Sequence, residues 1–383
     1  MIRPAGQLSR WVRLVLGLSL LLWTPIAQSD ERLRIVDVHV HTSPSFYRGV
    51  DDVLTAMGIS RFVNLSGGTI QSGLKDSLDA AHSFDGRLKV CVNLDWGQVA
   101  QPAFVADVVR DHRQAQRQGA AGLKISKALG LYIKDPARPR RLLAIDAPML
   151  DPIWEAAGQL GLPIFIHSGD PKAFFEAPTP ANERYAELTL HPNWSFHDAR
   201  FPRRHELLAA RDRVLARHPS TTFIGVHFAN NPEDLKYVDQ LLNTYPNLYV
   251  DLAARLPEIG RHDADRVRAL FIRHQDRILF GTDLGITRGG IMLGSVGRER
   301  PIIHDIFAFY ARHFQWLETD ARQMRHPTPI QGDWHIDAIG LPKAVLGKIY
   351  GLNAIKLFWP QQANMALDKA ALETGKSLAD FID

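Results

Sequence analysis

Five side chains that could bind a metal ion each lie at the end of a short apolar stretch of this chain. They are a pair of histidines two residues apart, two single histidines and one aspartate, namely His39, His41, His167, His227 and Asp283. Stretches that are apolar almost throughout are typical of strands covered on both faces, as in a parallel sheet with helices outside. Because parallel strands end at one edge of a sheet, we expect the five side chains to gather there. Imidazole and carboxylate groups gathered in this way predict a metal site suited to hydrolytic chemistry.

The pair His39 and His41 forms the sharpest local motif. Residues two apart on a strand point to the same side, so we expect Asp37, His39 and His41 to face inward and the intervening valines to face helices. Two such imidazoles can share one ion, although this spacing also arises by chance and in ordinary cores. Asp37 would lie deeper, supporting the metal ligands or forming the floor of the site.

Eight apolar runs alternate with amphipathic segments and predict the elements that position these residues. The runs are Leu33–Val40, Ile59–Leu65, Leu88–Leu94, Ala120–Ile125, Pro163–Ile166, Thr222–Val226, Asn247–Leu252 and Arg277–Thr282. The helical segments include Ala103–Gln118, Asp151–Leu160, Arg204–Arg217, Pro232–Thr244 and Ala264–His274. Eight alternations favour an α/β fold of the (β/α)₈ barrel type over an open, doubly wound sheet. The segment Asp37–Pro44 lacks the GxGxxG pattern, which argues against dinucleotide binding.

Two connections are long and leave the carboxyl ends of predicted strands. They run from Ser168 to about Arg203 and from Leu284 to about Leu341. Barrel enzymes build their active sites at this end of the strands, and long connections usually carry structure of their own. We therefore expect both to act as lids or specificity loops.

The bulk composition sets limits on partners and compartment. The 383 residues carry a formal charge of +4, and three arginines within residues 1–29 account for most of it. The nearly neutral remainder gives no argument for nucleic acid or a membrane surface as a partner. The single cysteine, Cys91, lies in an apolar run, so we expect a buried thiol and no intramolecular disulfide.

The first 29 residues resemble a secretory signal. The three arginines precede the apolar run Leu14–Trp23, which is short for a membrane span, and small residues before Asp30 suit cleavage. We expect a signal peptide over 1–29, a catalytic barrel over 30–360 and a helical tail over 361–383. The protein would then be exported, periplasmic or secreted, with an uncleaved membrane anchor as the alternative.

Several motifs resemble the amidohydrolase superfamily of metal-dependent barrel enzymes. The resemblance spans Arg34–Trp359 and is greatest to the amidohydrolase 2 branch, which includes aminocarboxymuconate semialdehyde decarboxylase, aromatic-acid decarboxylases and lactone hydrolases. The matching pieces are DVHVH (37–41), GLKIS (122–126), IFIHSGDP (164–171), IGVHFAN (224–230), ILFGTDLG (278–285) and KIYGLNAIKLF (348–358). Segments around Trp194, 317–319 and 331–334 resemble a bacterial subgroup of this branch that supplies no substrate.

The resemblance implies roles for the polar residues. His39, His41, His167 and Asp283 would bind one divalent ion, Zn²⁺ in first place and Mn²⁺ as an alternative, with room for a water molecule. Asp283 would take the proton of the attacking water. His227 would act as an acid or base, orienting the water or stabilising the oxyanion.

Lys124 and the substrate-binding cations are left with open alternatives. In parts of the superfamily a lysine at this place is carbamylated and bridges two ions, so Lys124 would hold a second metal only if so modified. Otherwise it contacts substrate or pairs with Asp283. The substrate would be a small molecule bearing a carboxylate, for which Lys172 and Arg288 are weak candidate contacts. A homo-oligomer is possible.

Three functions follow in order. The first is a metal-dependent hydrolase of an ester, lactone or amide of a small organic acid. The second is a metal-dependent non-oxidative decarboxylase of an unsaturated or aromatic acid. The third is a non-catalytic binding barrel, against which the intact set of metal-binding residues argues.

Overall fold

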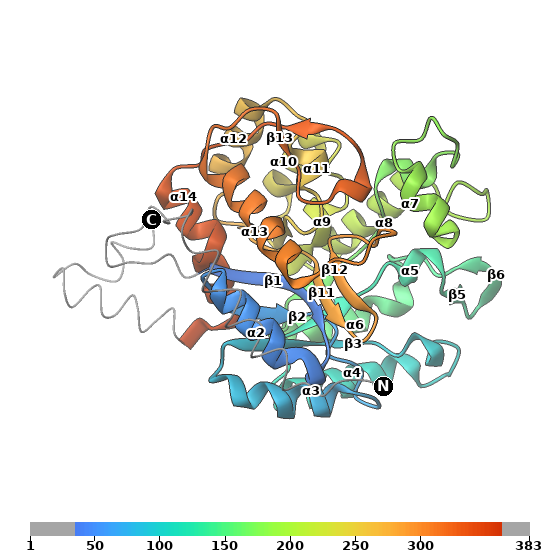
Figure 1. Cartoon of the computed structure of the whole chain (residues 1–383). Coiled ribbons are helices and arrows are strands. Elements are labelled where there is room, and N and C mark those ends of the chain that lie inside the picture. Colours follow the sequence, from blue (N-terminus) through green and yellow to red (C-terminus); the bar gives the residue numbers. More distant parts are fainter. Residues whose placement is uncertain (1–34, 362–383) are drawn as a thin grey trace, which may run out of the picture.

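A curled sheet of ten strands forms the centre of the part of the chain, residues 35–361, that the computed structural model describes (Figure 1). Its order is β10-β9-β8-β7-β4-β3-β2-β1-β11-β12. The bounds are β1 (Ile35–Thr42), β2 (Ile59–Asn64), β3 (Leu88–Asn93), β4 (Gly122–Ile125), β7 (Ile164–Ile166), β8 (Phe223–Gly225), β9 (Leu248–Asp251), β10 (Ile278–Leu279), β11 (Leu284–Thr287) and β12 (Gly290–Leu293). A strand lies within or overlaps each of the eight predicted runs, and only the β11–β12 pair of this sheet is antiparallel.

The sheet curls until its first strand meets the segment that follows β10. Val38 N donates to Phe280 O at 3.0 Å, and Asp283 N donates to His39 O at 2.9 Å. These hydrogen bonds bring the strand with His39 and His41 beside the segment with Asp283. The predicted α/β class is confirmed, and the curled, mostly parallel sheet is consistent with the predicted barrel.

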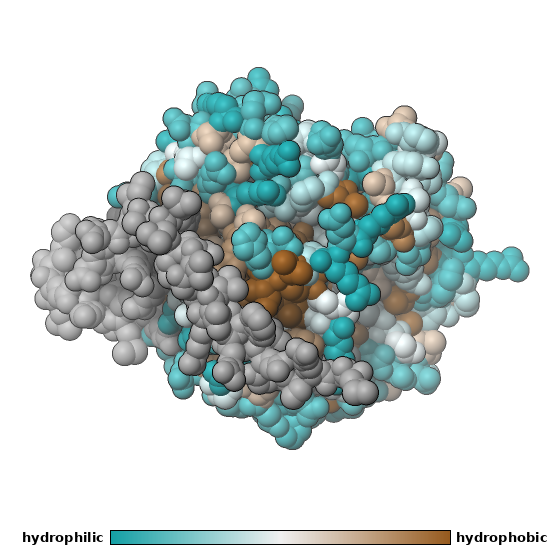
Figure 2. All heavy atoms as spheres, viewed as in Figure 1, coloured by the Kyte–Doolittle hydropathy of each residue, from teal (hydrophilic) through white to brown (hydrophobic). Residues whose placement is uncertain are grey.

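Helices cover the outside of the sheet (Figure 1). They are α2 (Tyr47–Ala56), α3 (Leu74–Ala81), α4 (Phe104–Arg117), α6 (Asp151–Gln159), α8 (Arg204–Arg217), α10 (Leu235–Thr244), α12 (Ala264–Arg273) and α14 (Lys343–Gly347). Their buried residues recur every three to four positions, as expected for helices with one apolar face. Hydrophilic side chains cover much of the outer face seen in Figure 2, and apolar ones gather near its middle.

An inner cluster of apolar side chains fills one end of the curled sheet. Its members come from many strands and from the closing helix α15 (Asn353–Phe358), and they are Val36, Val38, Val63, Leu65, Cys91, Phe165, Ile224, Val226, Leu279, Ala354, Ile355, Phe358 and Trp359. The Phe358 ring stacks on Phe165 with centroids 5.7 Å apart. Side chains from so many strands can share one cluster only on the concave side. This end is therefore solid core, and the polar residues occupy the other end.

The predicted alternation along β1 is wrong for its first half. Val36 and Val38 belong to the inner cluster, whereas Val40 packs in the larger outer core. The carboxylate of Asp37 lies on the outer side, where it binds helix α13 (Ile303–Glu318). The pairing of β1 with β2 shifts register between Asp37 and Val40. Such an irregularity changes which side of the sheet a residue faces, so His39 points inward although Asp37 does not.

The segments that follow β7 and β10 contain helices and strands of their own. The first holds α7 (Tyr185–Leu190), and the second holds β11, β12, α13, β13 (Met324–Arg325) and β14 (His335–Ile336). The sequence did not suggest a third insertion after β4, with α5 (Ala128–Leu131) and the hairpin of β5 (Lys134–Asp135) and β6 (Arg138–Leu142).

The predicted signal peptide over 1–29 and nearly all of the predicted tail over 361–383 lie outside the described residues. Within residues 35–361, none of the helices combines the length and the apolar character that a membrane crossing requires.

Candidate metal centre

Four of the five residues singled out from the sequence lie close together with nitrogen and oxygen atoms facing one another. Donor atoms of His39, His227 and Asp283 all lie within 4.8 Å of one another. His41 belongs with them, since its Nε2 lies 3.2 Å from His39 Nε2 and 3.3 Å from Asp283 Oδ1. His39 Nε2 and Asp283 Oδ1 are 3.6 Å apart. The carboxyl ends of β1, β8 and β10 thus converge as the strand pattern predicts.

In His39, His41 and His227, the Nδ1 atom on the far side of the ring makes a hydrogen bond that fixes the ring's orientation. His39 Nδ1 lies 2.8 Å from Asp251 Oδ2, and His227 Nδ1 lies 2.8 Å from Ala253 O. A carboxylate and a carbonyl oxygen only accept, so both Nδ1 atoms carry the proton and both neutral rings present a lone pair on Nε2. His41 Nδ1 pairs with Ser66 Oγ at 2.6 Å. This arrangement, with outer partners fixing the rings, is how metal-binding histidines are usually oriented.

The donor set fits a divalent ion. His39 Nε2, His41 Nε2 and a carboxylate oxygen of Asp283 face one another at 3.2–3.6 Å, and all three are atoms that can bind one cation. Ligand bonds of about 2.0–2.1 Å in a tetrahedron place neighbouring donors about 3.3 Å apart. The distances among His39, His41 and Asp283 are close to that value. Nitrogen and oxygen donors in this proportion suit zinc.

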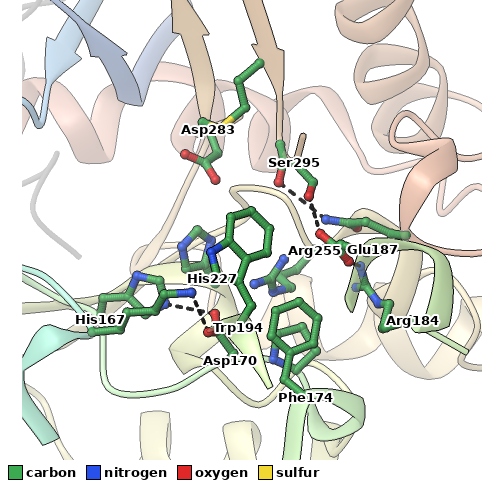
Figure 3. A pocket seen from close by; sticks show the side chains of 15 residues that line it. His167, Asp170, Phe174, Arg184, Glu187, Trp194, His227, Arg255, Asp283 and Ser295 are labelled. Atoms are coloured by element: carbon green, nitrogen blue, oxygen red, sulfur yellow. Dashed lines mark hydrogen bonds and ion pairs between the residues drawn. The ribbon is translucent and has the colours of Figure 1, made fainter. Parts of the chain in front are cut away.

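His167 lies beside this group but turns toward another partner. Its ring centroid is 4.6 Å from that of His227. Its Nε2 lies 3.5 Å from Asp170 Oδ1, and the other oxygen of Asp170 pairs with Lys127 Nζ at 2.5 Å (Figure 3). The structure thus places His167 at the edge of the cluster, three residues before an aspartate that the sequence analysis did not consider.

Asp251 is the functional candidate that sequence reasoning missed. It ends β9, is fully buried, and binds His39 through one oxygen and the backbone N–H of His227 through the other at 2.7 Å. One carboxylate therefore fixes two of the cluster's histidines. Its signal was present in the sequence, because Asp251 is the polar residue next to the end of the seventh apolar run, Asn247–Leu252.

Asp37 connects the two strands that carry His39 and Asp283. Its Oδ1 accepts from His39 N at 3.0 Å and Thr282 N at 3.2 Å. Its Oδ2 accepts from the hydroxyls of Thr282 and Tyr310, both at 2.6 Å. The supporting role expected for Asp37 is therefore visible, although its side chain acts from the outer side of the sheet.

A left-handed turn follows β8 and carries His227. Four consecutive residues, His227 to Asn230, have φ between 53° and 57°. L-residues in this region cost roughly 1–2 kcal/mol each, so the turn must be held by its surroundings. The Asn230 amide supplies part of this hold, since its Oδ1 accepts from Ser168 N at 2.9 Å and its Nδ2 donates to Gly169 O at 2.8 Å. The turn after His227 is thereby tied to the segment after His167.

Burial keeps the histidines neutral. Desolvation lowers the pKa of His39 and His227 well below the usual value and lowers the pKa of His167 to about 4. For Asp283 burial acts to raise the pKa, but the hydrogen bond from His41 and the nearby charges together lower it. Neutral imidazoles beside an ionised carboxylate are the protonation states that bind a metal ion.

Lys124 lies on β4 and is buried close to the same group. Desolvation lowers the pKa of its ammonium group to about 8, while the charges of Asp251 and Asp283 oppose that shift. No ion pair joins Lys124 to Asp283 within residues 35–361. The two alternatives for Lys124, modification or substrate contact, both use an amine of this kind.

A cleft that encloses about 450 Å³, part of it open to solvent, leads from the cluster to the surface (Figure 3). Its lining includes His167, His227 and Asp283, together with Lys127, Asp170, Pro171, Phe174, Arg184, Glu187, Trp194, Arg255, Met292, Gly294, Ser295 and Gln331. Residues from both segments, after β7 and after β10, are among them. The weak candidates Lys172 and Arg288 are not among these residues, because Lys172 is exposed and pairs with Glu176, and Arg288 lies in the exposed turn between β11 and β12.

The sequence profile of the amidohydrolase family matches residues 36–359. No curated protein matches the chain. Similar solved structures include 2,6-dihydroxybenzoate decarboxylase from Rhizobium, with 15% identity, 86% of this chain and 100% of that chain covered, and a TM-score of 0.49. Another is 5-carboxyvanillate decarboxylase from Sphingomonas paucimobilis, with 12% identity, coverage of 86% and 99%, and a TM-score of 0.45. A third is an amidohydrolase from Burkholderia multivorans, with 10% identity, coverage of 85% and 99%, and a TM-score of 0.46.

The family profile therefore spans both the strands that carry the histidines and the segment that carries Asp283. The chain belongs to the amidohydrolase family, in its amidohydrolase 2 branch.

Proposed function

We propose that this protein is a metal-dependent hydrolase that cleaves an ester, lactone or amide bond of a small organic acid. The observation that carries the proposal is the set of donor atoms on His39, His41 and His227 that lie within 4.8 Å of Asp283, the nearest of them at 3.3 Å. Membership of the amidohydrolase family supports an enzyme with a bound metal. The curled sheet supports the more specific description of a (β/α)₈ barrel, because β1 meets the segment after β10 through backbone hydrogen bonds.

His39, His41, His167 and Asp283 would hold one divalent ion, with zinc preferred. When bound, such an ion lowers the pKa of a water molecule and polarises the bond to be cleaved. His167 would turn its ring from Asp170 toward the cluster to complete the set. A second ion would require a carbamylated Lys124.

The remaining chemistry falls to two side chains. Asp283 has a lowered pKa, so its carboxylate is ionised and can take a proton from the attacking water and pass it to the leaving group. His227 has its proton on Nδ1, which donates to Ala253 O. Its Nε2 can therefore accept a hydrogen bond and orient the water. A neutral His227 cannot donate to an oxyanion, so of the two roles expected from the sequence we retain the first.

The second candidate function is non-oxidative decarboxylation, which would use the same residues. Product analysis distinguishes it from hydrolysis. Family membership supports both reactions, and the product tells them apart. Release of CO₂ without bond cleavage by water would replace the hydrolase proposal with the decarboxylase, whereas a metal-free protein that binds but never turns over would favour a binding barrel.

The experiment that tests the proposal measures metal content and turnover together. Purified protein and the variants His39→Ala and Asp283→Asn are analysed by inductively coupled plasma mass spectrometry and screened against aryl esters, lactones and amides of carboxylic acids. We expect about one zinc per chain in the parent protein, its loss in His39→Ala, and loss of turnover in both variants. Turnover that survives in Asp283→Asn would contradict the assigned proton transfer.

A further inference from the structure

The cleft contains one buried cation that has no anionic partner within the described residues. Arg255 is only 6% exposed and lies between β9 and the short helix α11 (Leu256–Ile259), where it lines the cleft with His227 and Asp283 (Figure 3). Its Nη1 donates to the carbonyl oxygen of Ala254 at 2.8 Å. No carboxylate oxygen within residues 35–361 lies within 4.0 Å of its guanidinium group. A buried charge without an opposite charge is costly, which indicates that something else supplies the anion.

The other cations of the cleft are already neutralised. Lys127 pairs with Asp170 at 2.5 Å. Arg184 is fully buried between two carboxylates, Glu187 at 2.8 Å and Glu258. Asp283, the remaining anion of the lining, faces His39 and His41. With an ion bound beside Asp283, no carboxylate of the lining remains to pair directly with Arg255.

The orientation of Arg255 leaves one edge of the guanidinium group without a hydrogen-bond partner among residues 35–361. Because Nη1 is bound to Ala254 O, the pair Nε–H and Nη2–H remains. These two parallel donors match the two oxygens of a carboxylate. Ala254 itself is held in the left-handed region, with φ 56°, directly before Arg255. The backbone strain thus falls on the residue that fixes the guanidinium group.

An aromatic wall bounds the same cleft. The ring of Phe174 stacks on Trp194 with centroids 6.3 Å apart. The ring of His191 also stacks on Trp194, with centroids 4.0 Å apart. Met292 adds a further apolar side chain to the lining. A ligand whose carboxylate binds Arg255 would therefore have an apolar or aromatic body to place against this wall.

We propose that Arg255 forms a carboxylate subsite of the cleft and selects substrates that combine a carboxylate with an apolar, preferably aromatic, body. The assignment rests on the proposed function, in that it takes the cleft as the place where substrate binds. It replaces the surface cations Lys172 and Arg288 as the charge that recognises the organic acid.

The test uses benzoate as a probe and its neutral analogue benzamide as the comparison, with binding followed by isothermal titration calorimetry. We expect benzoate to bind the parent protein and benzamide to bind far more weakly. Arg255→Gln should weaken benzoate roughly 10- to 100-fold, the loss expected for charge-assisted hydrogen bonds. Arg255→Lys keeps the positive charge but loses the pair of parallel N–H donors. Its benzoate affinity should lie between those of the parent protein and Arg255→Gln. Arg288→Gln is the matched control and should bind benzoate like the parent protein.

The outcomes separate this proposal from the proposed function. Benzoate binding is measured both with metal and after chelation, and the metal content of each variant is measured alongside. Equal benzoate affinity in Arg255→Gln and the parent protein, no benzoate binding by the parent protein, or equal affinity for benzamide would each overturn the subsite. A protein that binds benzoate through Arg255 but holds no metal would retain the subsite and remove the hydrolase. Melting curves of the two Arg255 variants establish that both are folded.

Discussion

At the scale of single residues, the metal centre depends on groups that never reach the ion. Asp251 fixes the His39 ring and the His227 backbone, and Asp37 ties the β1 and β10 ends together. Burial raises the pKa of both carboxyl groups to about 6. These aspartates are the positions at which conservative changes should affect metal binding without removing a ligand.

Replacing Asp251 with Asn should lower zinc affinity roughly 10- to 100-fold, the usual effect of losing an outer partner of a metal-binding histidine. A competition titration against a zinc-binding dye measures it. Asp239→Asn is the matched control, since Asp239 also holds a histidine, His274, at 2.7 Å but does so outside the cleft. An unchanged affinity in Asp251→Asn would show that Asp251 does not support the centre.

The residues that the sequence could predict are those whose signal is local. His39, His41, His227 and Asp283 each end an apolar run, and that rule needs no tertiary information. Asp251 lies one residue before the end of its run, and a lone carboxylate there has several ordinary explanations. Arg255 could not be selected from the cations near strand ends, because only the packing of Arg184 against Glu187 and Glu258 shows which cation lacks a partner.

At the scale of elements, close packing around β10 leaves no room beside the metal-binding strand. A Cβ added at Gly281 would lie 3.1 Å from the Cβ of His39 and 3.5 Å from that of Asp251. These Cβ atoms belong to buried strands, and moving a buried strand costs free energy. The absence of a side chain at Gly281 is therefore part of what allows the centre to form.

Gly281→Ala should destabilise the fold by about 1–3 kcal/mol through overpacking and should also weaken metal binding, although every ligand remains. Urea denaturation and the zinc competition titration measure the two effects. Gly169→Ala is the control, because nothing lies within 4 Å of a Cβ added there. Equal stability of the two variants would count against the packing argument.

The left-handed turn that carries His227 allows a second test at this scale. Asn230→Ala and Asn230→Gly both remove the amide that binds Ser168 and Gly169. They differ in backbone tolerance, since glycine adopts φ near 53° without the penalty that alanine pays. We therefore expect the alanine variant to be the less stable by about 1 kcal/mol in urea denaturation. Indistinguishable variants would mean that the turn is not strained.

Long helices and strands with a regular apolar pattern could be predicted from the sequence, whereas short or irregular ones could not. Helix α8 has the bounds that its apolar spacing indicates. Along β1, valines alternate with polar residues, and nothing in this pattern reveals the shift in register. The sequence therefore predicted the wrong side of the sheet for Asp37. The hairpin of β5 and β6 pairs so few residues that no periodicity marks it.

At the scale of the whole molecule, buried neutral histidines should make the fold sensitive to acid. Burial lowers the pKa values of His112, His313 and His326 to about 4, whereas the unfolded chain has values near 6.5. Between these values the unfolded chain binds more protons, so the free energy of unfolding falls as pH falls from 6.5 toward 4. Asp37 and Asp251 act in the opposite sense over part of this range, because their folded pKa values are raised.

His112→Gln isolates one of these contributions. Neither ring nitrogen of His112 has a hydrogen-bond partner within the described residues 35–361, so the replacement removes a titrating group and no hydrogen bond seen there. Chemical denaturation between pH 4.5 and 8 should show a pH slope that is shallower by up to ~1.4 kcal/mol per pH unit in the acid range. The two curves should run parallel above pH 7. A slope identical to that of the parent protein in acid would refute a neutral His112.

The closure of the sheet has a kinetic consequence. Asp37 and Thr282, which join the strands of His39 and Asp283, are 245 positions apart in the chain. The centre therefore cannot assemble until the first and last parallel strands have met, and closing so long a loop carries an entropic cost. An ion bound by both strands would act as a removable cross-link between the two ends of the chain. Its loss should then speed unfolding much more than it slows folding, because the contacts it holds form last.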